Sequence, residues 1–589
     1  MAATLTGHLL DRMRRLTART PRWARILLGV VLAGLGVLIV LRPFVSLTVL
    51  MLLIAGALVV GGVARLVEAG RMPHPLLARV AGAAEVLGGV LVVAWPLASV
   101  QVLALVAGVV LLISGAADAG AAFARTPGGR AAHALRGVAF LVLGVLSIVW
   151  PDVSLIVIAV VFAVRLVLLG IELVVRALRR ASDAPRPGRG IRALDLVGRG
   201  ALAVLAVVAL VGSILLHQDT PRPTAFYDAP ATVPAGPGHL IRSQPYTQAV
   251  PEGARGWLIL YTTTDLNGAP SVGSGFVMAP ADAASAPRDV VLWTHGTQGA
   301  DRACAPTLLP EPLPLAEPIA ALEQQLAEGR VLVGPDYPGM GTVGPQGYLV
   351  GQNEGRSSLD AVRAAHELPG LELSRRTVVW GHSQGGQAAL WTGGLAPDYA
   401  PELELLGVAA AAPAADVRGL IATLGDSVIG QVMGPYAVRA YAETYPDVRV
   451  RDYVDARMFP IYEAASRRCL PARATLVSLL TALTMQGRMY AVDPATGPLG
   501  ERLDENVPTL PVAVPLFIGQ GGADPLILPE VQARFIASRC AAGQELIYRE
   551  YAGRDHLSVV ADDSPFSAEL LAWTDDRFAG RPQSENTCP

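Results

Sequence analysis

The chain has 589 residues, of which 52% are hydrophobic and 16% are charged, and its formal net charge is −2. So small a net charge gives no overall field that would favour nucleic acid or another polyanion as a partner. The mean hydropathy of +0.43, combined with this share of charged residues, predicts a membrane part joined to a more polar part. The length allows more than one domain.

Seven apolar stretches of roughly membrane-spanning length, about 20 residues each, occupy the first 217 positions. They lie at approximately 25–42, 44–66, 78–95, 98–120, 134–150, 153–175 and 194–216. Several are too long and too uniformly apolar to be amphipathic surface helices, and no signal-peptide cleavage site follows the first. We therefore predict an all-α bundle of seven transmembrane helices over residues 1–217, surrounded by membrane lipids.

The first six stretches repeat one pattern of proline and glycine. An apolar run ends in a proline three times, and a glycine stands 19 residues after each, in the pairs Pro43 and Gly62, Pro96 and Gly115, and Pro151 and Gly170. The spacing predicts three helical hairpins, with small residues where helices pack closely in lipid. Over roughly residues 25–180 the chain resembles the acid-resistance membrane protein (HdeD-like) family.

Arginines predict the orientation of this bundle. The N-terminal segment and the loops after the second, fourth and sixth stretches are rich in arginine, whereas the opposite loops contain only Arg42. Positively charged loops stay on the cytoplasmic side, so we expect a cytoplasmic N-terminus. An odd number of spans then places everything after His217 outside the cell membrane.

Among the ionisable residues within the apolar stretches, the candidates for a function are Glu85, Asp118, Arg165 and Glu172. Charged groups inside a membrane are costly and often functional, so an ion path is one interpretation. Pairing inside the bundle, or a position near the interface, is the interpretation that we favour.

The composition changes abruptly at Asp219, where prolines begin to punctuate the chain. We expect a linker at 218–225 and a second domain at 226–589. Strand-like runs alternate with helical patterns there, which predicts an α/β domain with a doubly wound, mostly parallel sheet. Strands are expected at 256–264, 274–279, 290–294, 331–335, 377–380, 406–411, 514–519 and 545–551, and helices at 357–368, 384–393 and 529–541.

The segment Gly381-His-Ser383-Gln-Gly385 has the pattern G-x-S-x-G between a β-branched run and an Ala-rich helical run. This context is typical of a nucleophile elbow, in which a tight strand-to-helix turn exposes the serine hydroxyl. The helix that follows directs its N-terminal N–H groups toward a developing oxyanion. Ser383 is thus the candidate nucleophile.

The base and the acid follow from chain order, which is Ser, acid, His in α/β-hydrolases. Of nine histidines, only His556 comes after Ser383, and it stands in a polar loop after a strand-like run. Asp524 follows an apolar strand and a glycine turn, where a carboxylate can orient the imidazole. Weaker rivals for the acid are Asp555, Asp504 and Glu505.

An oxyanion hole needs two backbone donors. One should be the N–H of Gln384, directly after the nucleophile. The other should come from the loop after an early strand, where Gly296 and Thr297 both fit and the sequence does not decide between them. We expect the adjacent His295 to shape this loop.

From about Phe226 to its C-terminus the chain resembles the secretory lipase family. The matching segments are Phe226-Tyr227, Cys304-Ala-Pro306, Asp336-Tyr-Pro-Gly-Met-Gly341, Leu359-Asp-Ala-Val-Arg363, Gly381-His-Ser-Gln-Gly-Gly386, Asp524 and His556. The resemblance implies lipase or esterase activity with the residues named above. It also implies a helical cap inserted between sheet strands, at about 415–500.

All four cysteines, Cys304, Cys469, Cys540 and Cys588, lie in the second domain. An even number in an exported domain favours disulfides, and the sequence alone permits three pairings. The family resemblance implies Cys304–Cys469 and Cys540–Cys588. No cluster has the spacing of metal ligands and no glycine loop fits a phosphate, so we expect neither metal nor cofactor.

The leading hypothesis is a membrane-tethered serine lipase or esterase in lipid catabolism that hydrolyses hydrophobic carboxylic esters outside the cytoplasmic membrane. The same residues would also support an acyltransferase or a peptidase, because water, an alcohol or an amine can attack the acyl-enzyme. A further alternative is a non-catalytic envelope stress or binding protein. Oligomeric state and acyl-chain length stay open.

Overall fold

The computed structural model describes residues 22–41, 75–94, 100–123 and 127–149, with scattered residues at 56–71 and 167–215. It also describes 221–588, apart from gaps at 249, 283–285, 310–318, 426, 457, 472, 474 and 486–488. The chain divides into two compact units. The first unit comprises residues 1–218 with segments 455–461 and 480–489, and the second comprises the remainder.

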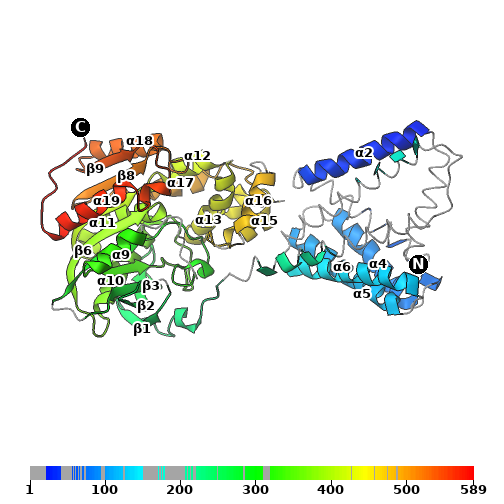
Figure 1. Ribbon diagram of the computed structural model, residues 1–589, viewed down its shortest axis with the longest axis horizontal. Coiled ribbons are helices and arrows are strands. Elements are labelled where there is room, and N and C mark those ends of the chain that lie inside the picture. The colour runs from blue at the N-terminus through cyan, green and yellow to red at the C-terminus, as the bar shows by residue number, and fades with distance from the viewer. Residues whose placement is uncertain are drawn as a thin grey trace. The chain divides into compact units, whose positions relative to one another are not determined.

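Helices make up the described part of residues 1–218 (Figure 1). They are α2 (Arg22–Leu41), α4 (Pro75–Ala94), α5 (Val100–Phe123) and α6 (Pro127–Val149), with the short 3-10 helix η1 (Ala69–Arg71). Four of the predicted apolar stretches therefore lie on helices, namely 25–42, 78–95, 98–120 and 134–150. The stretches 44–66, 153–175 and 194–216 fall largely outside the described residues.

None of the helices in the described part of the chain combines the length and the apolarity that crossing a bilayer requires. The predicted seven-span bundle is therefore not supported. One physical reason is visible in α6, whose first half carries Arg130, His133 and Arg136. Similarly, α5 carries Asp118 five residues before its end, so its uninterrupted apolar part is shorter than the helix.

Two of the ionisable residues are buried and hydrogen-bonded within the first unit. The Ser114 hydroxyl donates to Glu85 Oε1 at 2.6 Å, and His133 Nδ1 lies 2.9 Å from Asp118 Oδ1. This arrangement agrees with the favoured pairing interpretation. The other two, Arg165 and Glu172, lie outside the described residues.

Glycines let α5 and α6 approach closely. A Cβ atom added to Gly115 would lie 2.8 Å from the backbone nitrogen of Leu141, and one added to Gly137 would lie 3.0 Å from that of Ala119. Such distances leave no room for a side chain. The glycine that recurs in the predicted repeat thus has a packing role in its second copy.

The second unit contains one sheet of nine strands in the order β1-β2-β3-β5-β4-β6-β7-β8-β9. The strand pairs β1–β2, β2–β3 and β3–β5 are antiparallel, and the remaining pairs are parallel. The strands are β1 (Leu240–Tyr246), β2 (Ala254–Thr264), β3 (Pro270–Pro280), β4 (Arg288–Thr294), β5 (Val331–Pro335), β6 (Leu373–His382), β7 (Glu404–Ala411), β8 (Leu516–Gly521) and β9 (Ile547–Tyr551). The predicted mostly parallel sheet is confirmed, with an antiparallel edge.

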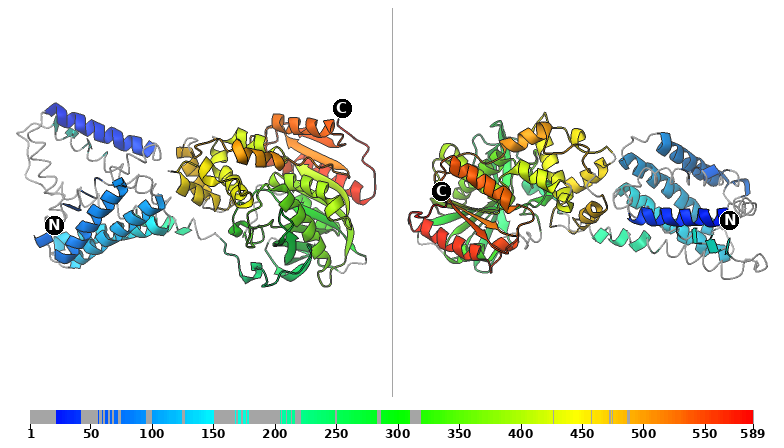
Figure 2. Two further views of the ribbon diagram at one scale, coloured as in Figure 1. Left: turned by 180° about the vertical axis from the view of Figure 1, so that it is seen from behind. Right: turned by 90° about the horizontal axis from the view of Figure 1, so that it is seen from above.

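Helices cover both faces of this sheet (Figure 2). One buried core packs the face formed by residues such as Leu292 and Val379 against α10 (Gly351–His366), α11 (Gln384–Tyr399) and α18 (Pro529–Ala541). The neighbouring residues Val291 and Trp380 belong to a second core with α9 (Ile319–Ala327) and α19 (Pro565–Phe578). Because successive strand residues point to opposite faces, each central strand contributes to both cores.

Six helices lie between β7 and β8 in the described chain. They are α12 (Val417–Leu424), α13 (Val428–Thr444), α14 (Val450–Tyr453), α15 (Phe459–Ser466), α16 (Thr475–Met485) and α17 (Gly497–Glu505). They occupy the region expected to be the helical cap. Among the described residues of the second unit there are also three short 3-10 helices, namely η3 (Ala225–Tyr227), η4 (Arg302–Cys304) and η5 (Ser558–Val560).

Two disulfides are present, and their pairing is the one that the family resemblance implies. Cys304 is bonded to Cys469, which joins the loop after β4 to the helices between β7 and β8. Cys540 is bonded to Cys588, which joins α18 to the C-terminal tail. The prediction of disulfides is confirmed.

Candidate active site

Ser383 occupies the turn between β6 and α11. Its φ of 57° lies in the left-handed region, which is uncommon for a residue with a side chain. A Cβ atom on Gly381 would lie 2.1 Å from the carbonyl oxygen of Gly385, and one on Gly385 would lie 1.9 Å from that of Thr294. Both glycines are therefore required by the crossing of backbones, as the elbow pattern predicts.

Thr294, the last residue of β4, ties the elbow to the neighbouring strand. Its buried hydroxyl lies 2.8 Å from the carbonyl oxygen of Trp380 and 2.7 Å from that of Gly385. These two acceptors stand on either side of Ser383 in the chain. Sequence reasoning missed this residue, although its place directly before the expected oxyanion loop was a usable signal.

His556 lies between Ser383 and Asp524. Its Nε2 is 2.9 Å from Ser383 Oγ, and its Nδ1 is 2.8 Å from Asp524 Oδ2. The three residues follow β6, β8 and β9, so the carboxyl ends of three parallel strands bring them together. All three side chains are buried. A carboxylate at Nδ1 requires that this nitrogen carries the proton, which leaves Nε2 free to accept one from the serine.

Asp524 is held in a fixed orientation. Its Oδ1 accepts hydrogen bonds from the backbone N–H groups of Leu526 at 2.8 Å and Ile527 at 2.9 Å. Its Oδ2 also accepts one from Gln520 Nε2 at 3.1 Å. These hydrogen bonds fix the carboxyl group and aim one oxygen at His556.

The rival carboxyl groups are engaged elsewhere. Asp555 caps the next turn of its own loop, and its hydrogen bonds with Ser558 hold the pKa of its carboxyl below the ordinary value. Asp504 pairs with Arg418 at 2.5 Å, and Glu505 pairs with Arg502 at 2.8 Å. Asp524 is the one among the four candidates that contacts the His556 ring at hydrogen-bond distance.

His382 links the elbow to the loop that carries His556. Its Nε2 lies 2.9 Å from the carbonyl oxygen of His556, so this nitrogen donates. The two rings lie 4.8 Å apart between centroids. His382 thereby fixes the backbone of His556 relative to Ser383.

The candidate oxyanion residues lie around Ser383. Gln384 begins α11 directly after it. A Cβ atom on Gly296 would lie 3.8 Å from Ser383 Cβ and 3.5 Å from the carbonyl oxygen of His382, so Gly296 stands against the elbow. Thr297 is buried, and its hydroxyl lies 3.2 Å from that of Tyr348.

His295 has the loop-shaping position that was expected. Its Nδ1 lies 2.7 Å from the carbonyl oxygen of Gly296, and its ring packs 4.2 Å from that of Tyr337. Burial lowers the pKa of His295 to about 4, so the ring is neutral at physiological pH. No group of three or more metal-ligating side chains occurs in the part of the chain that the structure describes.

Family models match both parts of the chain. Residues 317–586 match the secretory lipase family. Residues 27–75, 80–134 and 135–216 match three copies of a short repeat of unknown function, DUF308. The predicted threefold repeat is confirmed, while the resemblance to the acid-resistance family stays a prediction.

Two curated relatives match this chain over most of their own length. Lipase 6 from Candida albicans is 25% identical over 425 residues, which are 66% of this chain and 88% of that protein. A Mycobacterium tuberculosis protein named "Probable inactive lipase MT1628" is 27% identical over 405 residues, which are 63% of this chain and 84% of that protein.

Among solved structures, lipase A from Candida antarctica in its closed state aligns with a TM-score of 0.53 and 20% identity. The alignment covers 63% of this chain and 89% of that one. The second unit has the α/β-hydrolase fold. The predicted fold class is confirmed for this part of the chain.

Proposed function

We propose that this protein is a serine hydrolase that cleaves hydrophobic carboxylic esters through an acyl-enzyme. One observation carries the proposal: His556 is hydrogen-bonded to Ser383 Oγ at 2.9 Å and to Asp524 Oδ2 at 2.8 Å. The secretory lipase match and the lipase names of the relatives support an ester substrate.

The first half of the reaction follows from these contacts. Ser383 Oγ attacks the ester carbonyl carbon while His556 Nε2 takes the hydroxyl proton, and Asp524 stabilises the imidazolium that forms. The carbonyl oxygen becomes an oxyanion, which accepts hydrogen bonds from the N–H of Gln384 and from the N–H of Gly296 or Thr297. His556 then gives its proton to the departing alcohol, and the acyl group stays on Ser383.

The second half repeats the steps with water. His556 takes a proton from a water molecule that attacks the acyl carbon, and the same backbone donors hold the oxyanion. The carbon–oxygen bond to Ser383 breaks, the serine regains its proton from His556, and the carboxylic acid leaves.

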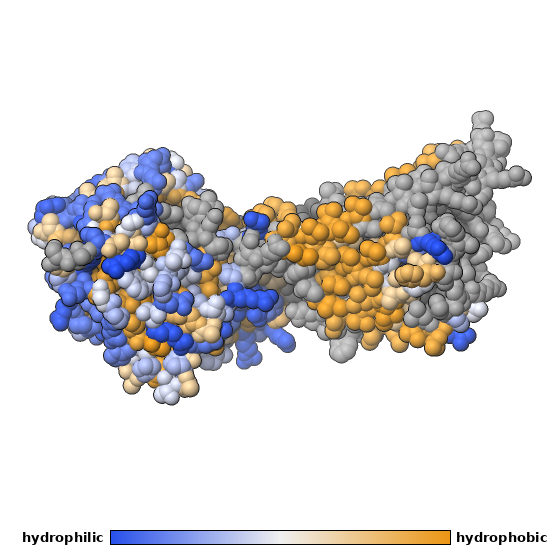
Figure 3. All heavy atoms as spheres, turned by 60° about the horizontal axis from the view of Figure 1, so that its bottom comes forward, coloured by the Kyte–Doolittle hydropathy of each residue, from blue (hydrophilic) through white to orange (hydrophobic). Residues whose placement is uncertain are grey.

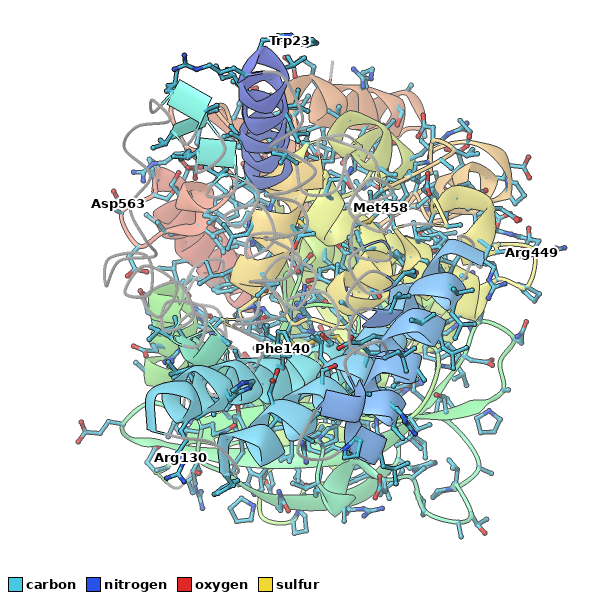
Figure 4. The ribbon with its side chains drawn as sticks, turned by 90° about the vertical axis from the view of Figure 1, so that its right-hand side faces the viewer. Trp23, Arg130, Phe140, Arg449, Met458 and Asp563 are labelled. Carbon is cyan, nitrogen blue, oxygen red and sulfur yellow. A yellow bond between two sulfur atoms is a disulfide. The ribbon has the colours of Figure 1, made fainter. Side chains whose placement is uncertain are left out.

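The N-terminal unit is the proposed membrane tether. Three observations support it: the repeated apolar stretches, the one-sided arginines and the exposed large apolar side chains. Trp23, Leu76 and Phe123 are 68%, 75% and 87% exposed, and Trp23 projects from the N-terminal end of α2 (Figure 4). Exposed apolar surface of this extent is typical of a unit that contacts lipid.

An extracytoplasmic position of the hydrolase domain belongs to the same proposal. The secretory lipase match supports it, and so do the two disulfides, because disulfides persist in oxidising compartments. The proposed division is 1–217, a linker at 218–225, and 226–589. Protease digestion of intact cells or spheroplasts should release an active fragment from the outer side. A hydrolase domain that becomes accessible only after lysis would overturn this part.

Fluorophosphonate labelling of the full-length protein tests the catalytic proposal. We expect the probe to bond to Ser383 in the folded protein, and we expect Ser383→Ala to abolish both labelling and hydrolysis of p-nitrophenyl esters. Ser374→Ala is the matched control, because Ser374 lies at the other end of β6 and its hydroxyl contacts Asp289. Equal labelling of wild type and Ser383→Ala would refute the assignment.

A non-catalytic binding role is the second candidate, and the name of the M. tuberculosis relative favours it. It predicts that the wild-type protein is not labelled at all. Product analysis with an added alcohol or amine acceptor separates hydrolysis from acyl transfer.

A further inference from the structure

Glu354 is a buried carboxyl group that the proposed reaction does not use. It lies in the first turn of α10, and none of its surface reaches solvent. Its Oε1 accepts hydrogen bonds from Gln384 Nε2 at 2.6 Å and from the backbone N–H of Leu349 at 3.0 Å. Burial raises the pKa of Glu354 to about 8, so the carboxyl is protonated at neutral pH.

The contact with Gln384 reaches one side of the candidate oxyanion site. Gln384 directly follows the nucleophile, and its own N–H is a candidate oxyanion donor. Its side chain is anchored on Glu354, in a different helix. The anchor fixes the first residue of α11 relative to α10, and hence the direction of that N–H.

The contact with Leu349 connects Glu354 to the other side of the candidate oxyanion site, where the loop of Thr297 lies. Leu349 has a φ of 57°, so its turn depends on surrounding contacts. Glu354 holds its N–H, and the Tyr441 hydroxyl of α13 donates to its carbonyl oxygen at 2.9 Å. The preceding residue, Tyr348, places its hydroxyl 3.2 Å from that of Thr297.

The turn at Tyr348 and Leu349 is also connected to the helices before β8. The Tyr348 ring packs edge-on against Tyr436 of α13, with 5.9 Å between centroids. With Tyr441 at its carbonyl, the turn bridges α13 and the loop of Thr297. One buried carboxyl group therefore joins both candidate oxyanion elements to a helix of the expected cap.

We propose that Glu354 is a positioning residue that aligns the two sides of the oxyanion site, Gln384 directly and the loop of Gly296 and Thr297 through the turn at Tyr348 and Leu349. The proposal rests on the esterase function proposed above. Glu354 touches no reacting atom, so its effect is on transition-state stabilisation.

Three variants of the full-length protein test it, with hydrolysis of p-nitrophenyl butyrate measured from pH 6 to 9.5. Glu354→Leu cannot accept either hydrogen bond, so we expect kcat to fall about 10- to 100-fold with KM changed less than about threefold. Glu354→Gln keeps an acceptor oxygen, so we expect kcat within about threefold of wild type at pH 7.

The dependence of kcat on pH distinguishes the positioning role from a purely structural role, which would leave this dependence unchanged. In the wild type, kcat should fall above pH 8, because ionisation of Glu354 places a negative charge beside the developing oxyanion. The titratable groups that face Glu354 are Tyr348 and Tyr441, and burial raises the pKa of both well above this range. Glu354→Gln should therefore lose the alkaline fall.

Asp360→Asn is the matched control. Asp360 lies six residues further along α10 and is equally buried, but its Oδ2 accepts from Thr263 and Tyr399, both at 2.8 Å. We expect its kcat and its alkaline limb within about twofold of wild type, since these contacts do not reach the oxyanion site.

Several results would overturn the inference. One is a Glu354→Leu variant that keeps the kcat of the wild type. Another is an Asp360→Asn variant that loses as much kcat as Glu354→Leu. The third is a Glu354→Gln variant whose kcat still falls above pH 8. The last measurement decides the matter if Glu354→Leu does not fold. Failure of the esterase function itself looks different, because wild-type hydrolysis would then be absent or would persist in Ser383→Ala.

Discussion

The two units of the chain use apolar residues in opposite ways. In the second unit, adjacent strand residues such as Val291 and Leu292 are fully buried in two separate cores. In the first unit, large apolar side chains such as Leu76 and Phe123 are mostly exposed. Figure 3 shows an apolar surface on the described helices of the first unit and a mixed, largely polar surface on the second.

The difference shows which unit buries its apolar side chains within its own fold. Apolar area exposed to water costs about 25 cal/mol per Å², so an extended apolar surface is stable only beside an apolar medium. The second unit satisfies this condition with its own helices, whereas the proposed membrane contact would satisfy it for the first unit. Changes confined to one unit should therefore leave the properties of the other intact.

The largest effect is expected from Asp524→Asn in the second unit. An amide cannot hold the proton on His556 Nδ1 in the way that the carboxylate does, so kcat should fall about 10³- to 10⁴-fold. Membrane association, measured by flotation with vesicles, should not change. A variant that keeps more than a tenth of the wild-type kcat would contradict the role of Asp524.

Removal of a disulfide sharpens the comparison on stability. The Cys304–Cys469 bond closes a separation of 165 residues and the Cys540–Cys588 bond one of 48. We expect paired Cys→Ser changes at the first to lower the free energy of unfolding by about 2–5 kcal/mol, and at the second by about 1 kcal/mol less. Urea titrations of hydrolase activity measure both losses, and a larger loss at the second bond would be inconsistent with loop-closure entropy.

Gly115→Leu is the corresponding change in the first unit. Because a Cβ atom there already meets the Leu141 backbone nitrogen at 2.8 Å, overpacking should destabilise the helical unit by about 1–3 kcal/mol. Gly34→Leu is its control, since open space surrounds Gly34. Thermal unfolding in detergent measures the effect, and hydrolysis per folded molecule should be unchanged in both. A loss of kcat in Gly115→Leu would break the independence of the units.

The last expected effect is a dependence of stability on pH, which is small only within a single pH unit. Burial raises the pKa of Glu354 from 4.5 to about 8, so between these values the folded chain binds a proton that the unfolded chain releases. The free energy of unfolding of the wild type should therefore fall with rising pH, relative to Glu354→Gln, by at most about 1.4 kcal/mol per pH unit. Parallel pH curves for the two proteins would show that Glu354 does not titrate in this range.

Much of the second unit could be predicted because its strands carry local signals. The runs around Val290, Val378 and Ile518 are apolar and β-branched, and each lies in a strand. The first strand, β1, was missed because its residues are polar and half exposed at the sheet edge. An edge strand has only one neighbour, so its sequence is less constrained.

The start of α10 was also missed, and with it Glu354. The sequence predicted a helix from residue 357, because Gly351 and Gly355 disfavour helix. In the structure these glycines allow α10 to pack against α11, since a Cβ atom on Gly351 would lie 2.0 Å from the Trp391 ring. Tertiary packing thus overrides propensity at this helix.

The candidate active site likewise contains residues that the sequence predicted and residues that it did not. Ser383 and His556 could be predicted from a motif and from chain order, both of which are local or countable. Thr294 and Glu354 were missed, because their contacts are with partners that only the fold brings near. The seven-span prediction was not supported, because none of the described helices is both long enough and apolar enough to cross a bilayer; polar residues in the first turns of α6 are one reason.

Trapping the acyl-enzyme tests the central claim most directly. The full-length protein is mixed with excess p-nitrophenyl butyrate, quenched in acid within milliseconds, digested and analysed by mass spectrometry. We predict a butyryl group on Ser383, formed with a burst of about one p-nitrophenol per protein, and none in His556→Ala on the same timescale. Turnover without any acyl group on Ser383, or equally fast acylation in His556→Ala, would contradict the account.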